Sequence, residues 1–258
     1  PMLARIGLYI SYWLRAKGPN RVHSPFVFSL YTDVILPDNQ YYVFDAIEKI
    51  RTKLLENNTL ISDSDPGAGS KSNPNQKSVR SIAQSSLLSP KQGRLLFRLT
   101  NYLQPKTILE LGTSLGISAL YLAKPTSAQV HTIEGRPSLV KLAQQNAKLL
   151  HAQNITVHSG RFEEVLPSLL PQLKQVDMLY LDGNHTFEAT LRYFEQIRPY
   201  MHSDTVIIMD DIRWSVDMMK AWLVLSKHSD IHVSVDLQKL GLLFFRPSQV
   251  KEHFILRV

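Results

Sequence analysis

The second half of the chain alternates between short apolar runs and longer amphipathic segments, and this alternation limits the folds that it can adopt. The apolar runs have the length of strands and lie at residues 107–111, 129–133, 155–158, 176–181 and 205–209. Segments with helical periodicity lie between most of them, at residues 115–123, 137–151, 187–200 and 214–227. Strands that alternate with helices favour a parallel sheet with crossover helices on its faces. We therefore expect an α/β fold with a doubly wound sheet.

The end of the chain departs from this alternation. The apolar runs 231–237 and 242–246 have only residues 238–241 between them. Parallel neighbours need a crossover of a dozen or more residues, so this pair predicts an antiparallel hairpin. The sheet should therefore have about seven strands, with the last strand antiparallel. We expect the connection at 162–173, which contains two prolines, to be short and broken.

The first hundred residues predict helices interrupted by one polar stretch. Helical patterns cover most of residues 2–57, and further helices are expected at 79–86 and 90–103. Gly, Ser, Asn, Pro and Lys dominate residues 61–78, which is typical of a loop or linker. Two interpretations of this stretch remain. It is either a disordered linker or a lid that orders over a ligand, with Asp65–Ser70 as the most structured part of the lid. The predicted domains are an N-terminal helical appendage (1–60), a flexible loop (61–78) and an α/β domain (79–258).

Composition narrows the class of function. The net charge is +7, but the basic residues form no long run, so no dedicated nucleic-acid surface is expected. The chain has no cysteine, which excludes disulfides, thiolate zinc sites and a cysteine nucleophile and fits a cytoplasmic location. We expect no secretory signal or transmembrane segment. The N-terminal helix permits weak membrane contact through Tyr9, Tyr12 and Trp13, and an oligomer is open.

The stretch Thr107–Ser118, TILELGTSLGIS, combines a buried strand, an acidic residue, a glycine turn and the start of a helix. Its spacing is E-x-G-x-x-x-G, formed by Glu110, Gly112 and Gly116. A glycine at the turn permits a backbone conformation that lets a ligand come close. The first amides of the following helix point to the same place. This stretch therefore predicts a site for a nucleotide-like ligand.

A second acidic residue supports this prediction. Glu134 follows the second strand and lies 22 residues after Gly112. A carboxylate at this place in such sheets accepts hydrogen bonds from ribose hydroxyls. The pair of motifs therefore favours an adenosine-containing ligand, without choosing between a dinucleotide and another adenosine cofactor.

More polar residues follow the fourth and fifth strands. Asp182 and His185 stand in LYLDGNH, and Asp210 and Asp211 stand in IIMDDIRW. Three carboxylates at one sheet edge repel one another unless a divalent cation or hydrogen-bonded solvent lies between them. Oxygen ligands suit magnesium or calcium better than zinc, and such a cation lowers the pKa of a bound hydroxyl. His185 is then a candidate general base. Helix capping by Asp182 and by one acid of the second pair is the alternative.

With these motifs, residues 107 to about 246 resemble a class I S-adenosylmethionine-dependent methyltransferase of the small-molecule O-methyltransferase type. The resemblance is carried by ELGTSLG at 110–116, Glu134, LYLDGNH at 179–185 and IIMDDIRW at 207–214. The family has a Rossmann-like sheet of seven strands with the last strand antiparallel. The resemblance therefore implies the same sheet that the hairpin predicts.

The resemblance also implies roles for single residues. Glu110, Gly112 and the turn would contact the methionine end of the cofactor, and Glu134 its ribose. The family often has an acid near the adenine where this chain has Arg161, so backbone groups around Gly160 and the Phe162 ring are expected to serve. Asp182, Asp210 and Asp211 match acids that bind magnesium in catechol-type enzymes. The whole predicted cofactor set is Glu110, Gly112, Thr113, Ser114, Gly116, Ser118, Glu134, Gly160, Arg161, Phe162 and Asp182, and the predicted catalytic residues are His185 and Asp182.

The leading hypothesis is transfer of a methyl group to a hydroxyl of a small-molecule acceptor, with positioning as the main source of catalysis. An NAD(P)-dependent oxidoreductase is the second hypothesis, although Ser114 and Ile117 replace glycines of the dinucleotide fingerprint. A non-catalytic cofactor-binding or interaction protein, with the N-terminal helices as partner surface, is the third. A catechol, a sugar, a lipid-linked headgroup and a peptide all remain open as acceptors.

Overall fold

The computed structural model describes residues 2–61 and 77–258, with side chains from residue 6 onward. It divides into two compact units. The first unit consists of Pro1–Pro37 and Leu173–Val258, and the second consists of Asp38–Gln172. This division differs from the predicted one, because the first helices belong with the C-terminal strands. The most polar part of the predicted 61–78 loop, including the suggested lid, lies outside the described residues.

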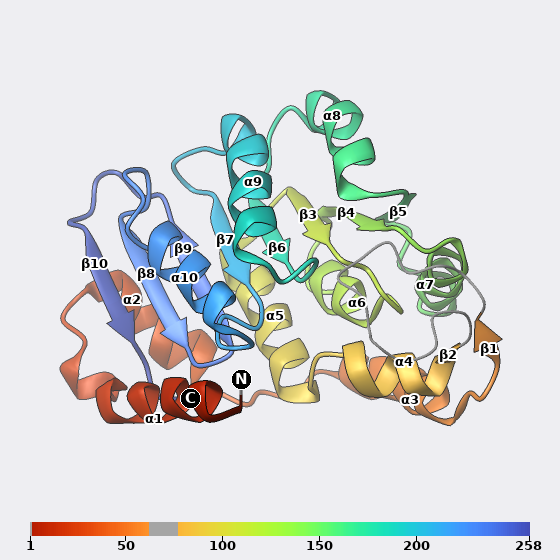
Figure 1. Ribbon diagram of the computed structural model, residues 1–258, viewed down its shortest axis with the longest axis horizontal. Coiled ribbons are helices and arrows are strands. Elements are labelled where there is room, and N and C mark those ends of the chain that lie inside the picture. The colour runs from red at the N-terminus through yellow and green to blue at the C-terminus, as the bar shows by residue number, and fades with distance from the viewer. Residues whose placement is uncertain (1, 62–76) are drawn as a thin grey trace. The chain divides into compact units, whose positions relative to one another are not determined.

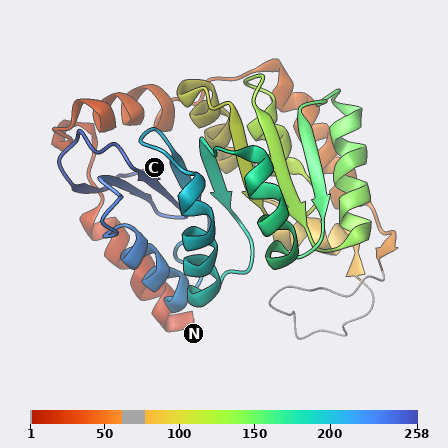
Figure 2. The same ribbon diagram turned by 90° about the horizontal axis from the view of Figure 1, so that it is seen from above.

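The second unit contains three parallel strands in the order β3-β4-β5, which lie side by side in Figure 2. Their bounds are β3 (Thr107–Leu111), β4 (Gln129–Glu134) and β5 (Ile155–Ser159). Two short strands, β1 (Leu60–Ile61) and β2 (Lys77–Ser78), form a separate antiparallel pair. The helices are α3 (Tyr42–Glu56), α4 (Val79–Ser86), α5 (Pro90–Leu103), α6 (Ile117–Ala123), α7 (Pro137–Leu149) and α8 (Phe162–Leu173), whose last residue crosses the unit boundary.

The helix starts in this unit follow from local capping chemistry. Ser89 precedes α5, and its side chain accepts a hydrogen bond from the Gln92 amide at 3.3 Å. The Gln92 side chain in turn accepts one from the Ser89 amide at 3.1 Å, which completes a capping box. Pro90 occupies the first helical position, where its missing N–H costs no hydrogen bond. This helix begins and ends at the predicted residues.

The prediction for residues 162–173 is wrong, because this segment forms the continuous helix α8. Pro167 and Pro171 lie inside the helix, and both are exposed. Leu166, Leu169 and Leu170 form its buried face. Burial of the leucines stabilises the helix despite the two prolines.

The first unit contains five strands in the order β10-β8-β9-β7-β6. Their bounds are β6 (Met178–Leu181), β7 (Val206–Met209), β8 (Val233–Leu237), β9 (Leu240–Phe244) and β10 (Glu252–Ile255). Its helices are α1 (Met2–Arg15), α2 (Pro25–Ser29), α9 (Phe187–Ile197) and α10 (Val216–Leu225), with short helical turns η1 (Pro19–Arg21), η2 (Leu30–Ile35) and η3 (Arg198–Tyr200).

The predicted hairpin is confirmed. Strands β8 and β9 pair antiparallel with Leu237 opposite Leu240, so only two residues form the turn. Strand β9 is also antiparallel to β7. The chain then adds β10, parallel to β8, which the sequence analysis missed because its residues are exposed or only half buried. The α/β class with mostly parallel strands is confirmed, with eight sheet strands in the described residues against about seven expected.

Helix α1 is held by the last strand of the same unit, as Figure 1 shows. The Tyr12 hydroxyl donates a hydrogen bond of 2.6 Å to the Leu256 carbonyl. The Lys17 amide donates to the Ile255 carbonyl at 2.8 Å, and the Arg257 amide donates to the Lys17 carbonyl at 3.0 Å. The two ends of the chain therefore stabilise each other.

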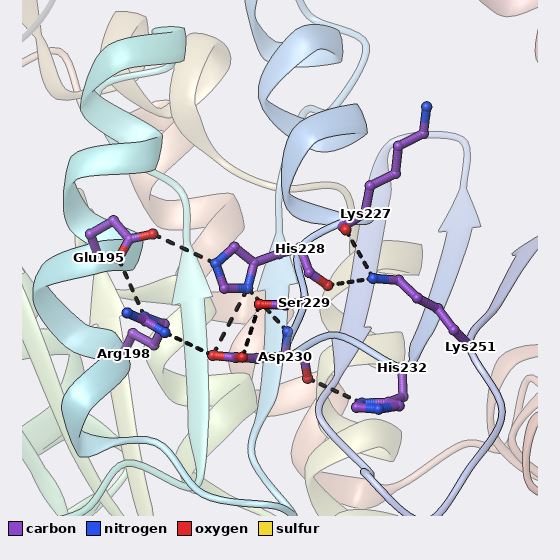
Figure 3. Close-up of polar contacts among 8 residues, drawn as sticks. All are labelled: Glu195, Arg198, Lys227, His228, Ser229, Asp230, His232 and Lys251. Atoms are coloured by element: carbon purple, nitrogen blue, oxygen red, sulfur yellow. Dashed lines mark hydrogen bonds and ion pairs between the residues drawn. The ribbon is translucent and has the colours of Figure 1, made fainter.

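Polar and charged residues around the loop after α10 contact one another, as Figure 3 shows. The Lys251 ammonium donates to the carbonyls of Lys227 and His228 at 2.9 and 2.6 Å. Arg198, at the end of α9, donates to the Asp230 carboxylate at 2.9 Å. These contacts of Lys251, Arg198 and Asp230 fix the loop between α10 and β8.

We expect Gly241→Ala to lower the free energy of unfolding by about 1–3 kcal/mol, the usual cost of overpacking a core. A Cβ at Gly241, in β9, would lie 2.4 Å from the Trp222 ring, which is fully buried. Gly18→Ala is the matched control, because a Cβ there meets no atom within 4 Å. Urea unfolding of the two variants measures the difference. Equal stability of both variants would contradict the packing argument.

Candidate functional site

The turn after β3 has the backbone that its glycines predict. Gly112 and Gly116 both have positive φ angles, 107° and 80°. A Cβ at Gly116 would also lie 3.1 Å from the Ala143 side chain, on α7. The amides of Gly112 and Thr113 both donate to the Ile133 carbonyl, which ties the turn to the end of β4. The turn is therefore held firmly on one side, and its glycines leave the backbone accessible to a ligand.

Glu110 is the most unusual residue of this turn. Its side chain is fully buried, and neither carboxylate oxygen has a hydrogen-bond partner among the described residues. Burial raises the pKa of Glu110 to about 7, although the hydroxyls of Ser118 and Thr132 lower it. A buried carboxylate without a partner is costly, and each such group in a folded protein needs a reason. A ligand that brings a cationic hydrogen-bond donor would supply the missing partner.

Glu134 lies at the end of β4 and reaches back to the glycine turn. One of its carboxylate oxygens accepts a hydrogen bond from the Ser114 amide and the other from the Arg136 amide, both at 2.9 Å. The Ser114 hydroxyl also bonds that of Ser86, at the end of α4, at 2.8 Å. A carboxylate oxygen can accept more than one hydrogen bond. The sequence analysis missed these contacts within the turn.

The residues after β5 lie at the start of α8. Gly160 has a φ of 143°, and a Cβ there would lie 2.9 Å from the Val165 side chain. The Arg161 amide donates to the Glu164 carboxylate at 3.2 Å, so a nearby acid caps this helix. The Arg161 side chain is exposed and that of Phe162 is half buried. Adenine recognition by these residues stays a prediction.

The acid pair after β7 is held by a hydrogen-bond network in the first unit. The buried Asp210 carboxylate accepts from the Tyr180 hydroxyl at 2.9 Å and from the Asp211 amide at 2.7 Å. Burial and the Asp211 charge raise the pKa of Asp210 to about 6. Asp211 has a positive φ of 51°, which is uncommon for a residue with a side chain. The network therefore holds Asp211 in a fixed, unusual conformation.

His185 lies near two carboxylates of the same unit. Its Nε2 is 3.6 Å from Asp182 Oδ1, and both side chains are partly exposed. Burial lowers the pKa of His185, while the negative charge of Asp211 raises it. The net effect keeps the imidazole neutral near pH 7, which is the form that accepts a proton.

The capping alternative for these acids is wrong. Thr186 caps α9, since its hydroxyl accepts from the Ala189 amide at 3.4 Å. Ser215 caps α10 by accepting from the Met218 amide at 3.0 Å. Asp182, Asp210 and Asp211 therefore cap neither helix.

The metal site predicted from Asp182, Asp210 and Asp211 is not formed. In the part of the chain that the structure describes, no three histidine or acidic residues lie close enough together to hold a metal ion. The two oxygens of Asp210 accept hydrogen bonds from the Tyr180 hydroxyl and the Asp211 amide. The described residues do not fit a bound divalent cation, so no chemical step here depends on one.

The fold defines a Rossmann-like α/β protein with a nucleotide-type turn after its first parallel strand. A family described as a methyltransferase domain matches residues 109–212. This region contains the glycine turn, Glu134 and the acids after β6 and β7. This region is similar to a methyltransferase domain, and the predicted resemblance to class I small-molecule O-methyltransferases is confirmed.

Two relatives with established names agree with this family. A catechol O-methyltransferase of Niastella koreensis is 28% identical over 129 residues, which cover 48% of this chain and 58% of that relative. A catechol O-methyltransferase of Bos taurus is 30% identical over 97 residues, which cover 36% of each chain. The matches to these two relatives therefore span less than two thirds of their length.

Solved structures support the fold. An O-methyltransferase from Bacillus cereus in complex with SAH has a TM-score of 0.57 and 17% identity, and covers 85% of this chain and 97% of its own. An O-methyltransferase from Streptomyces achromogenes in complex with SAM has a TM-score of 0.58 and 18% identity, covering 85% and 96%. At this identity the likeness shows a shared fold.

Proposed function

We propose that this protein transfers the methyl group of S-adenosylmethionine to a hydroxyl of a small molecule. The observation that carries the proposal is Glu110, a fully buried carboxylate without a partner among the described residues, beside a turn that only glycines permit. The cofactor has an ammonium group at its methionine end, which matches this carboxylate. The names of the relatives, catechol O-methyltransferases among them, support a hydroxyl as the acceptor.

Each predicted cofactor residue of the second unit then has a role in binding. Glu110 accepts hydrogen bonds from the ammonium group, and the Gly112 backbone allows the methionine end to approach. Glu134 accepts hydrogen bonds from the ribose hydroxyls as well as from the Ser114 amide. Thr113, Ser114, Gly116 and Ser118 shape the turn, and Gly160, Arg161 and Phe162 are proposed for the adenine.

The acids and the histidine that follow β6 and β7 are proposed to activate the hydroxyl of the acceptor. When bound, the cofactor supplies an electrophilic methyl group on its sulfonium. His185 takes the proton of the acceptor hydroxyl. Asp182 lies nearest to Nε2, which favours the proton on that nitrogen and leaves the Nδ1 lone pair to accept. Asp211 stabilises the imidazolium that forms, and Asp210 positions Asp211. The predicted divalent cation stays outside this proposal, and the cytoplasmic location stays a prediction.

We expect Glu110→Gln to weaken binding of S-adenosylhomocysteine by about tenfold or more, because a charged hydrogen bond is stronger than a neutral one. Isothermal titration calorimetry measures this effect. Glu56→Gln, at an exposed position in the same unit, is the control and should bind as the wild type does. Wild type that binds NAD(H) but not S-adenosylhomocysteine would favour the oxidoreductase. Cofactor binding without methyl transfer to any catechol, sugar or peptide would favour a non-catalytic protein.

The same variant also tests the buried charge itself. The pKa of Glu110 is about 7 in the folded protein and about 4.5 in the unfolded chain, so the folded state binds its proton more tightly. Stability without ligand is therefore greatest below pH 4.5 and falls as the pH rises to about 7. At pH 8, Glu110→Gln should be more stable than wild type by up to about 3 kcal/mol. Near pH 4.5 the difference should close, and a constant difference would contradict the assignment.

A further inference from the structure

Helix α1 turns an apolar face to the solvent. Ile6, Ile10, Trp13 and Leu14 are 46, 55, 47 and 82% exposed. Their spacing places them on one side of the helix. Tyr12 lies on the other side, fully buried, with its hydroxyl on the Leu256 carbonyl. The exposed stripe is therefore a result of how α1 is docked, and Tyr12 is not available for the membrane contact that the sequence suggested.

The charged residues in and just after this helix are all basic. From residue 1 to residue 32 the sequence contains Arg5, Arg15, Lys17 and Arg21 and no acidic residue. Arg15, Lys17 and Arg21 are exposed, and they follow the stripe directly. Arg15 donates a hydrogen bond to the Ser11 carbonyl within α1, and a neutral carbonyl leaves its positive charge uncompensated. An apolar stripe thus ends in a group of cations.

We propose that α1 is an interfacial helix that binds this protein to an anionic lipid surface. Ile6, Ile10 and Leu14 enter the boundary between headgroups and acyl chains, with the Trp13 ring at the headgroup level. Lys17 and Arg21 attract the anionic headgroups. In the described part of the chain, no helix has the length and apolarity to cross a membrane. Helix α1 has 14 residues, fewer than the roughly 20 that a span needs, so we place it along the surface.

The charge of the segment favours lipid over a protein partner. A second copy of this chain would bring its own Arg15, Lys17 and Arg21 toward the same face, and like charges at close range repel. An anionic bilayer offers negative charge and apolar depth at once. The inference does not depend on the proposed methyl transfer, because it uses only α1 and the turn that follows it.

Vesicle flotation of the full chain tests this proposal. Wild type should float with vesicles of phosphatidylcholine and phosphatidylglycerol and remain unbound with phosphatidylcholine alone. Trp13→Ser/Leu14→Ser should reduce the partition coefficient by about tenfold or more, since it removes two of the four apolar anchors. Lys17→Glu/Arg21→Glu should reduce it similarly, and salt should weaken wild-type binding.

Leu223→Ser/Val224→Ser is the matched control, because these side chains on α10 are 44 and 46% exposed. This variant should float like wild type, and thermal unfolding should show that all the variants fold. Absence of flotation, equal binding to neutral vesicles, or equal loss in the control would overturn the proposal. So would a wild-type dimer that becomes monomeric on Trp13→Ser/Leu14→Ser, since the stripe would then be a self-interface.

Discussion

The His185→Asn variant is expected to transfer methyl groups at least about a hundredfold more slowly than wild type at pH 7, the usual loss when a general base is removed. Burial lowers the pKa of His185, so wild-type kcat/KM should fall only at a pH below the ordinary range of histidine. The variant should lose the contribution of His185 to this acidic limb, while Asp210, with a pKa of about 6, and Glu110, with a pKa of about 7, still titrate in this range. Initial rates between pH 5 and 9 with a catechol acceptor measure both effects.

The control for this experiment is His23→Asn, an exposed position in the same unit. It should keep the wild-type rate and pH profile. Affinity for S-adenosylhomocysteine should also stay unchanged in His185→Asn, since the proposal gives His185 no cofactor contact. A variant that keeps the whole wild-type acidic limb would remove His185 from the mechanism, and a loss confined to cofactor binding would assign it another role.

Replacing Arg213 with methionine is expected to cost about 3–5 kcal/mol of unfolding free energy, as for other buried ion pairs that lose one member. Arg213 donates two hydrogen bonds of 2.6 Å to Asp236, and the two side chains are 1 and 3% exposed. It also donates to the carbonyls of Gln238 and Leu8 and lies 4.9 Å from the centre of the Tyr12 ring. Removing it leaves the Asp236 carboxylate buried without its cation.

Two further variants separate the ion pair from simple packing. Arg213→Met/Asp236→Leu removes both charges and should recover much of the lost stability, because no buried charge is left alone. Lys220→Met removes one member of an exposed pair, 3.9 Å from Asp217, and should change stability by less than about 1 kcal/mol. Urea unfolding of the three variants gives the comparison. A double variant as unstable as Arg213→Met would show that shape, not charge, is lost.

Features set by neighbours in the chain could be predicted from the sequence. Helix α5 begins at Pro90 because Ser89 and Gln92 cap it within one turn. The hairpin of β8 and β9 was predicted because four residues cannot form a crossover. Gly112 and Gly116 were correctly singled out, since their φ angles are closed to most other residues.

Features that depend on contacts between distant parts of the chain could not be predicted from the sequence. Nothing near Glu134 indicates that it accepts from the Ser114 amide, 20 residues away. The hydrogen bond from Tyr180, in β6, to Asp210, just after β7, joins residues that are 30 positions apart, and no local pattern indicates it. The docking of Tyr12 against Leu256 turns the other side of α1 outward, whereas the sequence suggested that Tyr12 itself is available for membrane contact. Tertiary packing decided each of these cases.

The division of the chain into units has a consequence for synthesis on the ribosome. The second unit is one continuous stretch, Asp38–Gln172, whereas the first joins Pro1–Pro37 to Leu173–Val258. The Tyr12 hydroxyl must wait for the carbonyl of Leu256, 244 residues later, and Lys17 must wait for Ile255 and Arg257. At about 5–20 residues per second, this delay lasts on the order of ten seconds or more. The middle of the nascent chain can therefore gain structure first, while the N-terminal helix meets chaperones or a lipid surface before it meets its own partner strand.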